Sequence, residues 1–220
     1  IAELFTLYRP ATRRSWLASI FHGIDRGLKV IEKLPVKPSR EVALRRAERW
    51  ILTRLGGSDG LGAIFPGIVN TIIALRCLGY AEDHPALKQE IANLERLEIE
   101  EQDTLRVQPC FSPVWDTVLT MNAMLAAEVP GDDPDLLQAA EWVLDKEVRQ
   151  PGDWQLKMQD VEPGGWYFEY ANEFYPDCDD TAEALVALSK IRFPDPQLDQ
   201  RREAALARAL KWQAGMQNRD

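Results

Sequence analysis

The sequence has few residues that hold metals or form disulfides, and it has no long uncharged run. Its three cysteines, Cys77, Cys110 and Cys178, lie far apart without a CxxC pair, and there are only two histidines. This pattern favours free, buried thiols in a reducing compartment over a disulfide framework or a zinc site. The longest segment without charge, Gly60–Leu75, has sixteen residues and is interrupted by glycine and proline. It is too short to cross a membrane.

The sequence also lacks a surplus of basic residues. It has 26 Lys and Arg against 35 Asp and Glu, which gives a formal net charge of −9. Binding to nucleic acid phosphates needs the opposite balance, so we predict no nucleic-acid partner. Hydrophobic residues at 45% and charged residues at 28% are typical of a globular chain, and 220 residues suffice for one or two domains.

Helical periodicity dominates the sequence, and only Gly165–Tyr170 alternates as a strand would. Ala-rich, charged segments that carry tryptophan alternate with more apolar segments that begin at proline. This alternation of outer and inner helices predicts an all-α fold, part of an α/α toroid or (α/α)6 barrel. We expect residues 1–39 to be an irregular and partly helical segment and 40–220 to be a partial barrel. Helices are predicted near 18–34, 40–54, 66–79, 84–97, 114–127, 134–148, 178–190 and 198–216.

A 27-residue aromatic loop, Gln150–Pro176, leads into the densest carboxylate cluster, Asp177, Asp179 and Asp180. Loops of that length in a compact domain usually have a function or a specific packing role. The cluster is open to three interpretations: the capped start of a helix, a Mg²⁺ site for a diphosphate, or an acid for proton chemistry. In the third, three crowded carboxyls cannot all ionise in an apolar cavity, so one keeps its proton. Aromatic faces would then attract the resulting cation without bonding to it.

The segment Pro163–Leu185, PGGWYFEYANEFYPDCDDTAEAL, closely resembles the acid-motif region of squalene–hopene cyclases, with their DxDDTA signature. The segments Ser112–Thr117 (SPVWDT) and Pro151–Trp154 (PGDW) resemble two further regions of those enzymes, in the same order. The tryptophan-bearing helices resemble degenerate QW repeats. The resemblance runs from about residue 3 to 217. It implies an isomerase of hopanoid biosynthesis that protonates a terminal alkene of squalene and starts a carbocation polycyclisation, with no cofactor and no metal.

The resemblance also implies roles for individual residues. Asp179 matches the proton donor, and Asp177 and Asp180 match flanking acids that position it and tune its acidity. Glu169 departs from the pattern, because relatives often have Gln there, and this leaves substrate and product open. The Pro66 segment matches a pocket lining, and Tyr175 is either a pocket aromatic or a ring stacked on the Asp-bearing turn. The predicted substrate and cation-stabilising residues are Phe168, Trp115, Tyr175, Ile64 and Phe65.

The resemblance further implies partners and a location. The partner would be squalene, and the full enzyme would associate monotopically with the cytoplasmic side of a bacterial inner membrane; a homodimer is compatible with it. The family's enzymes are longer, and their histidine partner of the acid lies downstream, whereas no histidine follows Asp180. We therefore expect a fragment of a longer enzyme, a split subunit or a truncated gene product, and no turnover by the chain in isolation. Alternatives are a class II diterpene cyclase acting on a prenyl diphosphate, a glycosidase, or a non-catalytic helical scaffold derived from a cyclase.

Overall fold

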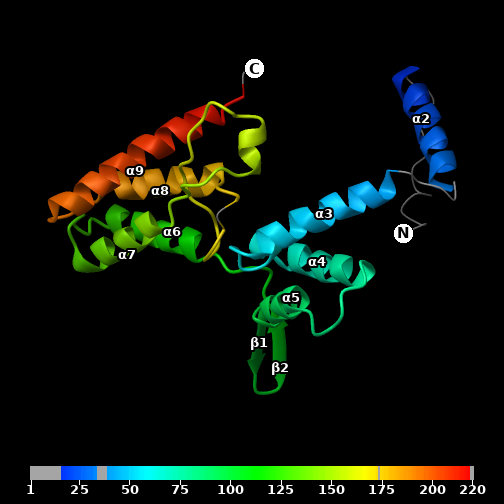
Figure 1. The fold of residues 1–220 in the computed structure, drawn as a ribbon. Helices are drawn as coiled ribbons and strands as arrows, with labels where there is room; N and C mark the ends of the chain where they lie inside the picture. Colours follow the sequence, from blue (N-terminus) through cyan, green and yellow to red (C-terminus); the bar gives the residue numbers. More distant parts are fainter. Residues whose placement is uncertain (1–15, 34–38, 173, 219–220) are drawn as a thin grey trace. The chain divides into compact units, whose positions relative to one another are not determined.

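The computed structural model describes residues 16–33, 39–172 and 174–218. Internal contacts divide the chain into two units, 1–47 and 48–220, which are described separately. The boundary between them falls inside a helix, so the division at residue 39 that the sequence suggested stays a prediction. The α-helices of the described residues are α2 (Trp16–Lys33), α3 (Arg40–Leu55), α4 (Phe65–Cys77), α5 (Pro85–Glu95), α6 (Pro113–Ala126), α7 (Pro134–Asp145), α8 (Cys178–Lys190) and α9 (Pro196–Gly215) (Figure 1).

These helices confirm the predicted ones to within a few residues at each end, because local signals fix where they begin. Proline occupies the first turn of α4, α5, α6, α7 and α9, where its missing N–H is not needed. Aspartate side chains cap three helices by accepting backbone N–H groups, namely Asp133 at α7, Asp177 at α8 and Asp195 at α9. Two short 3₁₀ helices, η1 (Leu61–Ala63) and η2 (Asp153–Leu156), lie in the loops.

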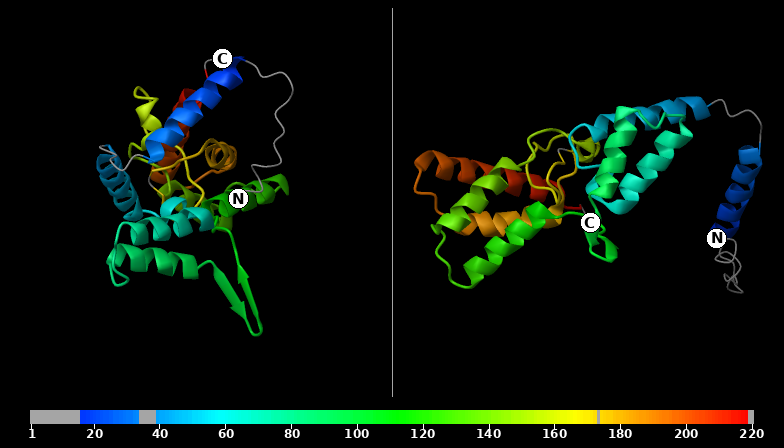
Figure 2. Two further views of the ribbon diagram at one scale, coloured as in Figure 1. Left: turned by 90° about the vertical axis from the view of Figure 1, so that its right-hand side faces the viewer. Right: turned by 90° about the horizontal axis from the view of Figure 1, so that it is seen from below.

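The four C-terminal helices show the predicted alternation of inner and outer members. Helices α6 and α8 pack against each other, α7 packs on α6, α9 packs on α8, and α7 also contacts α9 (Figures 1 and 2). This is the arrangement of a segment of an α/α toroid. Its continuous core has Trp166, Val143 and Leu188 among its fully buried members.

A second, smaller core joins α4 and α5 to the end of α3. It is built on the buried side chains of Leu55, Leu75 and Leu87. The Tyr80 hydroxyl, which lies beside this core, donates a hydrogen bond of 2.6 Å to the Glu48 carboxylate. This core holds the η1 loop, whose residues face the site described below.

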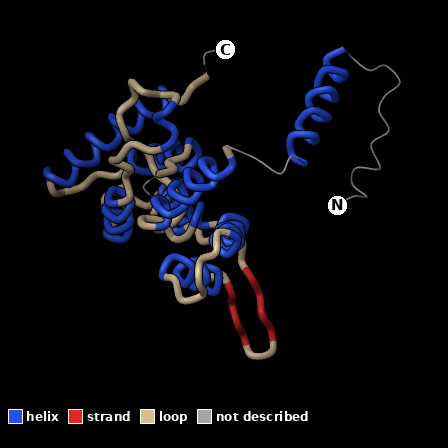
Figure 3. The backbone as a smooth tube through the Cα atoms, turned by 45° about the vertical axis from the view of Figure 1, so that its right-hand side comes forward, coloured by secondary structure: helices blue, strands red, loops and turns tan. Residues whose placement is uncertain are grey.

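The sequence did not predict the β-hairpin, and Gly165–Tyr170, the one segment whose pattern alternates as a strand would, forms no strand. Strands β1 (Glu98–Glu101) and β2 (Thr104–Val107) pair antiparallel and extend away from the helices (Figure 3). Both strands are only four residues long and largely exposed, so their short alternation of polar and apolar residues is a weak strand signal. At Gly165–Tyr170 the chain makes only an isolated bridge, between Trp166 and Asp177.

The prediction of buried thiols is wrong for two of the three cysteines. Cys77 and Cys178 are exposed, and Cys110 is half-buried. Cys77 ends α4 and Cys178 begins α8, where a side chain leaves the packed face of its helix. None of the helices in the described ranges is long and apolar enough to cross a bilayer.

Candidate active site

The aromatic loop is fixed to the start of α8 by Trp166. The buried Trp166 indole donates to the carbonyl of Val143 at 2.7 Å, and its backbone N–H donates to the Thr181 hydroxyl at 3.0 Å. The backbone N–H of Asp177 donates in turn to the Trp166 carbonyl at 3.0 Å. Gly165, at φ +95°, allows this approach, since a Cβ there would lie 2.6 Å from the Thr181 hydroxyl. The loop therefore holds the acid cluster in one place.

Asp177 caps α8, as the first interpretation of the cluster predicted. Its Oδ1 accepts the backbone N–H groups of Asp179 and Asp180, both at 2.9 Å. These two bonds and the positive end of the helix dipole stabilise a negative charge on Asp177. Only one of the three carboxyls caps the helix, so the side chains of Asp179 and Asp180 are available for other roles.

Asp180 is the buried carboxyl of the cluster. Only 3% of its surface is exposed, and no described residue forms a hydrogen bond with its Oδ1. Burial, a hydrogen bond to Asp177 and the Asp177 charge together raise the pKa of the Asp180 carboxyl to about 8, with smaller effects from Glu169 and Asp179. At neutral pH Asp180 therefore holds a proton. The sequence argument expected one neutral carboxyl in this cluster and assigned it to Asp179, the match to the proton donor, whereas the buried environment that favours a proton belongs to Asp180.

Asp179 is exposed at the rim of a hollow of about 280 Å³. The hollow is lined by Trp115, Phe168, Asp177, Cys178, Asp179 and Asp180. The structure thus brings together the three acids and two of the predicted aromatic residues, from α6, from the loop and from α8. A cation formed here would face two aromatic rings.

A second hollow of about 270 Å³ shares Phe168 and Asp177 with the first. Tyr175, Trp154 and Glu169 are among its walls. The predicted pocket residues Ile64 and Phe65 line neither hollow. They lie at the half-exposed start of α4, where Ile64 forms a backbone bridge with Cys110.

Tyr175 is held by a charged network that the sequence did not reveal. Its hydroxyl accepts a hydrogen bond from Arg54 Nε at 3.0 Å and donates to Asp153 Oδ2 at 3.2 Å. Arg54 forms an ion pair with Asp153 and lies over the Trp50 ring at 4.3 Å from its centroid. The interpretation of Tyr175 as a ring stacked on the Asp-bearing turn misses these partners. The one available signal was Asp153, which belongs to the PGDW segment.

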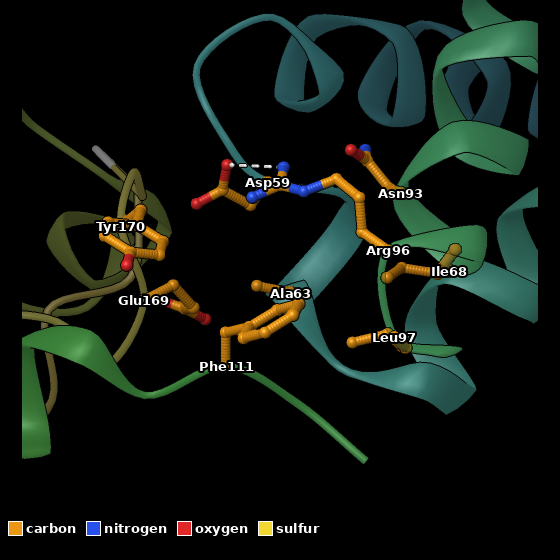
Figure 4. Close-up of a pocket in the computed structure, with 9 residues that line it drawn as sticks. All are labelled: Asp59, Ala63, Ile68, Asn93, Arg96, Leu97, Phe111, Glu169 and Tyr170. Carbon is orange, nitrogen blue, oxygen red and sulfur yellow. Dashed lines mark ion pairs between the residues drawn. The ribbon is translucent and has the colours of Figure 1, made fainter. Parts of the chain in front are cut away.

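Glu169 is a further titratable group beside the acid cluster. It is 5% exposed, and its Oε2 accepts a hydrogen bond of 3.1 Å from Asn172. Burial raises the pKa of Glu169 to about 7; the Asn172 bond opposes this, and the charges of Asp177 and Asp59 add to it. Figure 4 shows Glu169 facing a small hollow opposite the Asp59–Arg96 ion pair. The sequence marked Glu169 as a departure from the family pattern but gave it no role.

The structure also bears on metal binding. Across residues 16–33, 39–172 and 174–218, no group of three or more His, Cys, Asp or Glu side chains is arranged to hold a metal ion.

Two family models match the chain. Residues 111–220 match the squalene-hopene cyclase C-terminal domain, and residues 2–103 match the N-terminal domain. The matched segments together account for most of the chain.

Curated relatives give the same result. The chain is 37% identical over 202 residues to dammaradiene synthase of Dryopteris crassirhizoma, which covers 92% of the chain and 29% of that protein. It is 37% identical over 222 residues to squalene–hopene cyclase of Alicyclobacillus acidocaldarius, and this match covers 99% of the chain and 34% of that protein. It is also 37% identical over 207 residues to squalene–hopene cyclase of Zymomonas mobilis, and the match covers 90% of the chain and 31% of that protein. The chain spans about a third of the length of these relatives.

Proposed function

The chain belongs to the squalene–hopene cyclase family of class II terpene cyclases, and we propose that the complete protein cyclises squalene by protonating a terminal alkene. The observation that carries this proposal is the acid cluster on one wall of a hollow whose other walls are Trp115 and Phe168. Strong acid and aromatic faces are the two elements that such a reaction needs in one place.

In the proposed step a carboxylic acid gives its proton to the terminal alkene carbon and is left as a carboxylate. The π bond breaks, its electrons form the new C–H bond, and the positive charge moves to the more substituted carbon. Asp179 is the proposed donor, because it lies at the hollow with its carboxyl not engaged in capping. Asp177 remains the capping anion, and the protonated Asp180 limits the number of negative charges beside the donor.

The aromatic residues would stabilise the cation as it moves along the folded chain. A ring face attracts a cation within about 6 Å by roughly 0.5–2 kcal/mol or more, and it cannot trap the cation in a covalent bond. Phe168 lines both hollows and is the proposed residue next to the first cation. Trp115 and the hydrogen-bonded Tyr175 are the proposed further walls.

The test is incubation of the full reading frame that contains this chain with squalene and, separately, with geranylgeranyl diphosphate. Pentacyclic products from squalene without Mg²⁺ support the proposal. Products from the diphosphate alone would instead indicate a diterpene cyclase, and absence of product from both would favour a scaffold. We expect the 220-residue chain by itself to give no product, because the transition state needs an enclosing wall on all sides.

We further propose that the full enzyme binds one leaflet of a membrane, with α2 as a contact. Eight apolar side chains of this helix are more than 45% exposed, and all but Val30 lie along one face: Trp16, Leu17, Ile20, Phe21, Ile24, Leu28 and Ile31. Arg26, Lys29 and Lys33 lie away from that face, as in helices that lie in the plane of the bilayer interface. The location at the cytoplasmic side of a bacterial inner membrane and the homodimer remain predictions that rest on the family resemblance.

The membrane contact is tested by flotation with anionic vesicles. The double variant Phe21→Asp, Ile24→Asp should lose vesicle binding and keep the unfolding temperature of the parent. The matched control is the double variant Leu105→Asp, Val107→Asp, which places the same two charges on exposed apolar residues of β2. If the α2 variant instead lowers the unfolding temperature and leaves vesicle binding unchanged, the face packs against protein and the proposal fails.

A further inference from the structure

Glu169 is a buried acid that is hydrogen-bonded to the turn before α8. Its Oε2 accepts from the amide of Asn172, and the Asn172 Oδ1 accepts the backbone N–H groups of Phe174 and Tyr175, both at 3.2 Å. Asn172 is itself 3% exposed. Glu169 is therefore tied, through one amide side chain, to the turn that leads directly into Asp177.

The charged and titratable groups around Glu169 come from four parts of the unit, residues 48–220. The loop after α3 and the end of α5 contribute the Asp59–Arg96 pair, with 3.6 Å between Oδ1 and the guanidinium. The segment before α6 contributes Cys110, and Glu169 is followed directly by Tyr170. The start of α8 contributes Asp177, which lines one hollow together with Glu169, and the buried Asp180, whose backbone N–H donates to Asp177 Oδ1 at 2.9 Å.

These surroundings are negative on balance. Arg96 is the one cation among the residues that line the small hollow of Figure 4, and Asp59 already engages it. Among the described residues no ion pair joins Glu169 to a cation. Without a counter-ion beside it, a charge on the buried Glu169 acts more strongly on the acidic groups nearby than it would in water.

We propose that Glu169 is a positioning residue for the acid cluster, whose buried carboxylate, held by Asn172, keeps a proton on the Asp177–Asp180 pair. This inference rests on the proposed function only where it concerns turnover. An anion at position 169 makes the removal of that proton more costly, because a second negative charge would then appear nearby. In agreement with this, the charge of Glu169 is one of the causes that raise the pKa of Asp180.

The consequence is a range of pH over which the cluster stays protonated. As pH rises, Glu169 ionises near 7 and thereby opposes ionisation of Asp180. Without the charge at 169, the pair would lose its proton at lower pH. We expect the substitution Glu169→Gln to move that titration down by about one pH unit, an ordinary size for a shift inside a folded protein. The Gln oxygen still accepts from Asn172, so the turn is kept.

The experiment measures the protonated-carboxyl infrared band of the full-reading-frame protein as pH is raised, with Asp180→Asn to identify the band. In parallel it records the pH profile of squalene conversion. For Glu169→Gln, the infrared midpoint and the basic limb of the profile should both move about one unit to lower pH. Glu169→Asp keeps the charge, so its infrared midpoint should lie close to the pH of the parent midpoint. The matched control is Glu183→Gln on α8, which keeps its hydrogen bond from Asn122 and should leave both measurements unchanged.

The outcomes separate this inference from the proposed function. An unmoved infrared midpoint in Glu169→Gln overturns the inference and assigns Glu169 a purely structural role, whatever the activity. A shifted midpoint in a protein that converts no squalene supports the inference and overturns the proposed function. If Glu169→Gln does not fold, the comparison of Glu169→Asp with the parent decides, since the shorter acid should hold the midpoint within a few tenths of a unit.

Discussion

The Thr181 hydroxyl lies 3.0 Å from the backbone N–H of Trp166 and accepts its hydrogen bond. Both residues are fully buried, and they come from the first turn of α8 and from the aromatic loop. Because Asp177 and Asp180 flank this point, the bond sets the distance between the loop and the acid cluster.

Replacing Thr181 with Val should therefore destabilise the protein. The substitution keeps the shape of the side chain and leaves a buried N–H without its acceptor, which costs roughly 1–3 kcal/mol. Urea unfolding followed by tryptophan fluorescence should show a lower midpoint with an unchanged slope. Thr120→Val is the control, because the Thr120 hydroxyl is exposed and bonds only to a carbonyl of its own helix. Equal loss in the two variants would show that the loop contact contributes nothing specific.

Much of the fold could be predicted from the sequence because its signals are local. Proline and aspartate mark where α4 to α9 begin, and the pattern of charge separates outer from inner helices. The hairpin at Glu98–Val107 could not be predicted in this way, because its two strands are largely exposed and pair with each other.

The site was only partly predictable for a related reason. The family motif located the acids, and the capping role of Asp177 follows from helix preferences. Which of Asp179 and Asp180 is buried depends on what packs against α8, and helical spacing does not contain that information. The bonds from Arg54 to Asp153 and Tyr175 join residues 99 and 121 positions apart, so no local pattern could reveal them.

The raised pKa of Asp180 makes folding depend on pH. An aspartate titrates near 3.9 when unfolded, and in the folded chain Asp180 titrates at about 8. The folded state binds this proton more tightly, so the stabilising contribution is complete below about pH 4 and is lost as pH rises through 8. Glu169, with a folded pKa of about 7, acts in the same direction. We expect the free energy of unfolding to fall between pH 5 and pH 8.

The variant Asp180→Asn should flatten this dependence. It cannot ionise, so it should be more stable than the parent at pH 8, by on the order of 2 kcal/mol, and similar to it at pH 5. Chemical unfolding at both pH values measures the difference. An Asp180→Asn protein that loses stability equally at pH 5 and pH 8 would mean that the carboxyl is already ionised at pH 5.

Arg54 should stabilise the aromatic loop through its bonds to Asp153 and Tyr175. Replacing it with Ala removes two charge-assisted partners and the ring contact with Trp50, so we expect a loss of about 2 kcal/mol. Lys keeps the charge but lacks the planar fork, and it should recover less than half of the loss. Thermal unfolding of the two variants tests this. Arg76→Ala is the control, since Arg76 forms an exposed ion pair with Glu82 that should contribute little.

Asp179→Asn tests the assignment of the proton donor. The amide keeps the shape of the side chain and removes the acidic proton, so in the full-reading-frame protein it should abolish squalene conversion. Because Asp179 is exposed and its backbone N–H, not its side chain, makes the capping bond, helix content and unfolding temperature should not change. Asp177→Asn should cost less activity, since Asn caps a helix nearly as well as Asp.

The comparison between neighbours is the decisive part of that experiment. Asp180 is the carboxyl that burial keeps protonated, and it lies one residue, about 100° around α8, from Asp179. If Asp179→Asn retains near-parental conversion of squalene while Asp180→Asn loses it, the donor is Asp180. Asp179 would then be a residue at the rim of the hollow without a part in the proton transfer. If Asp179→Asn is inactive and Asp180→Asn keeps a reduced rate with a shifted pH profile, the exposed acid is the donor and the buried one sets its acidity.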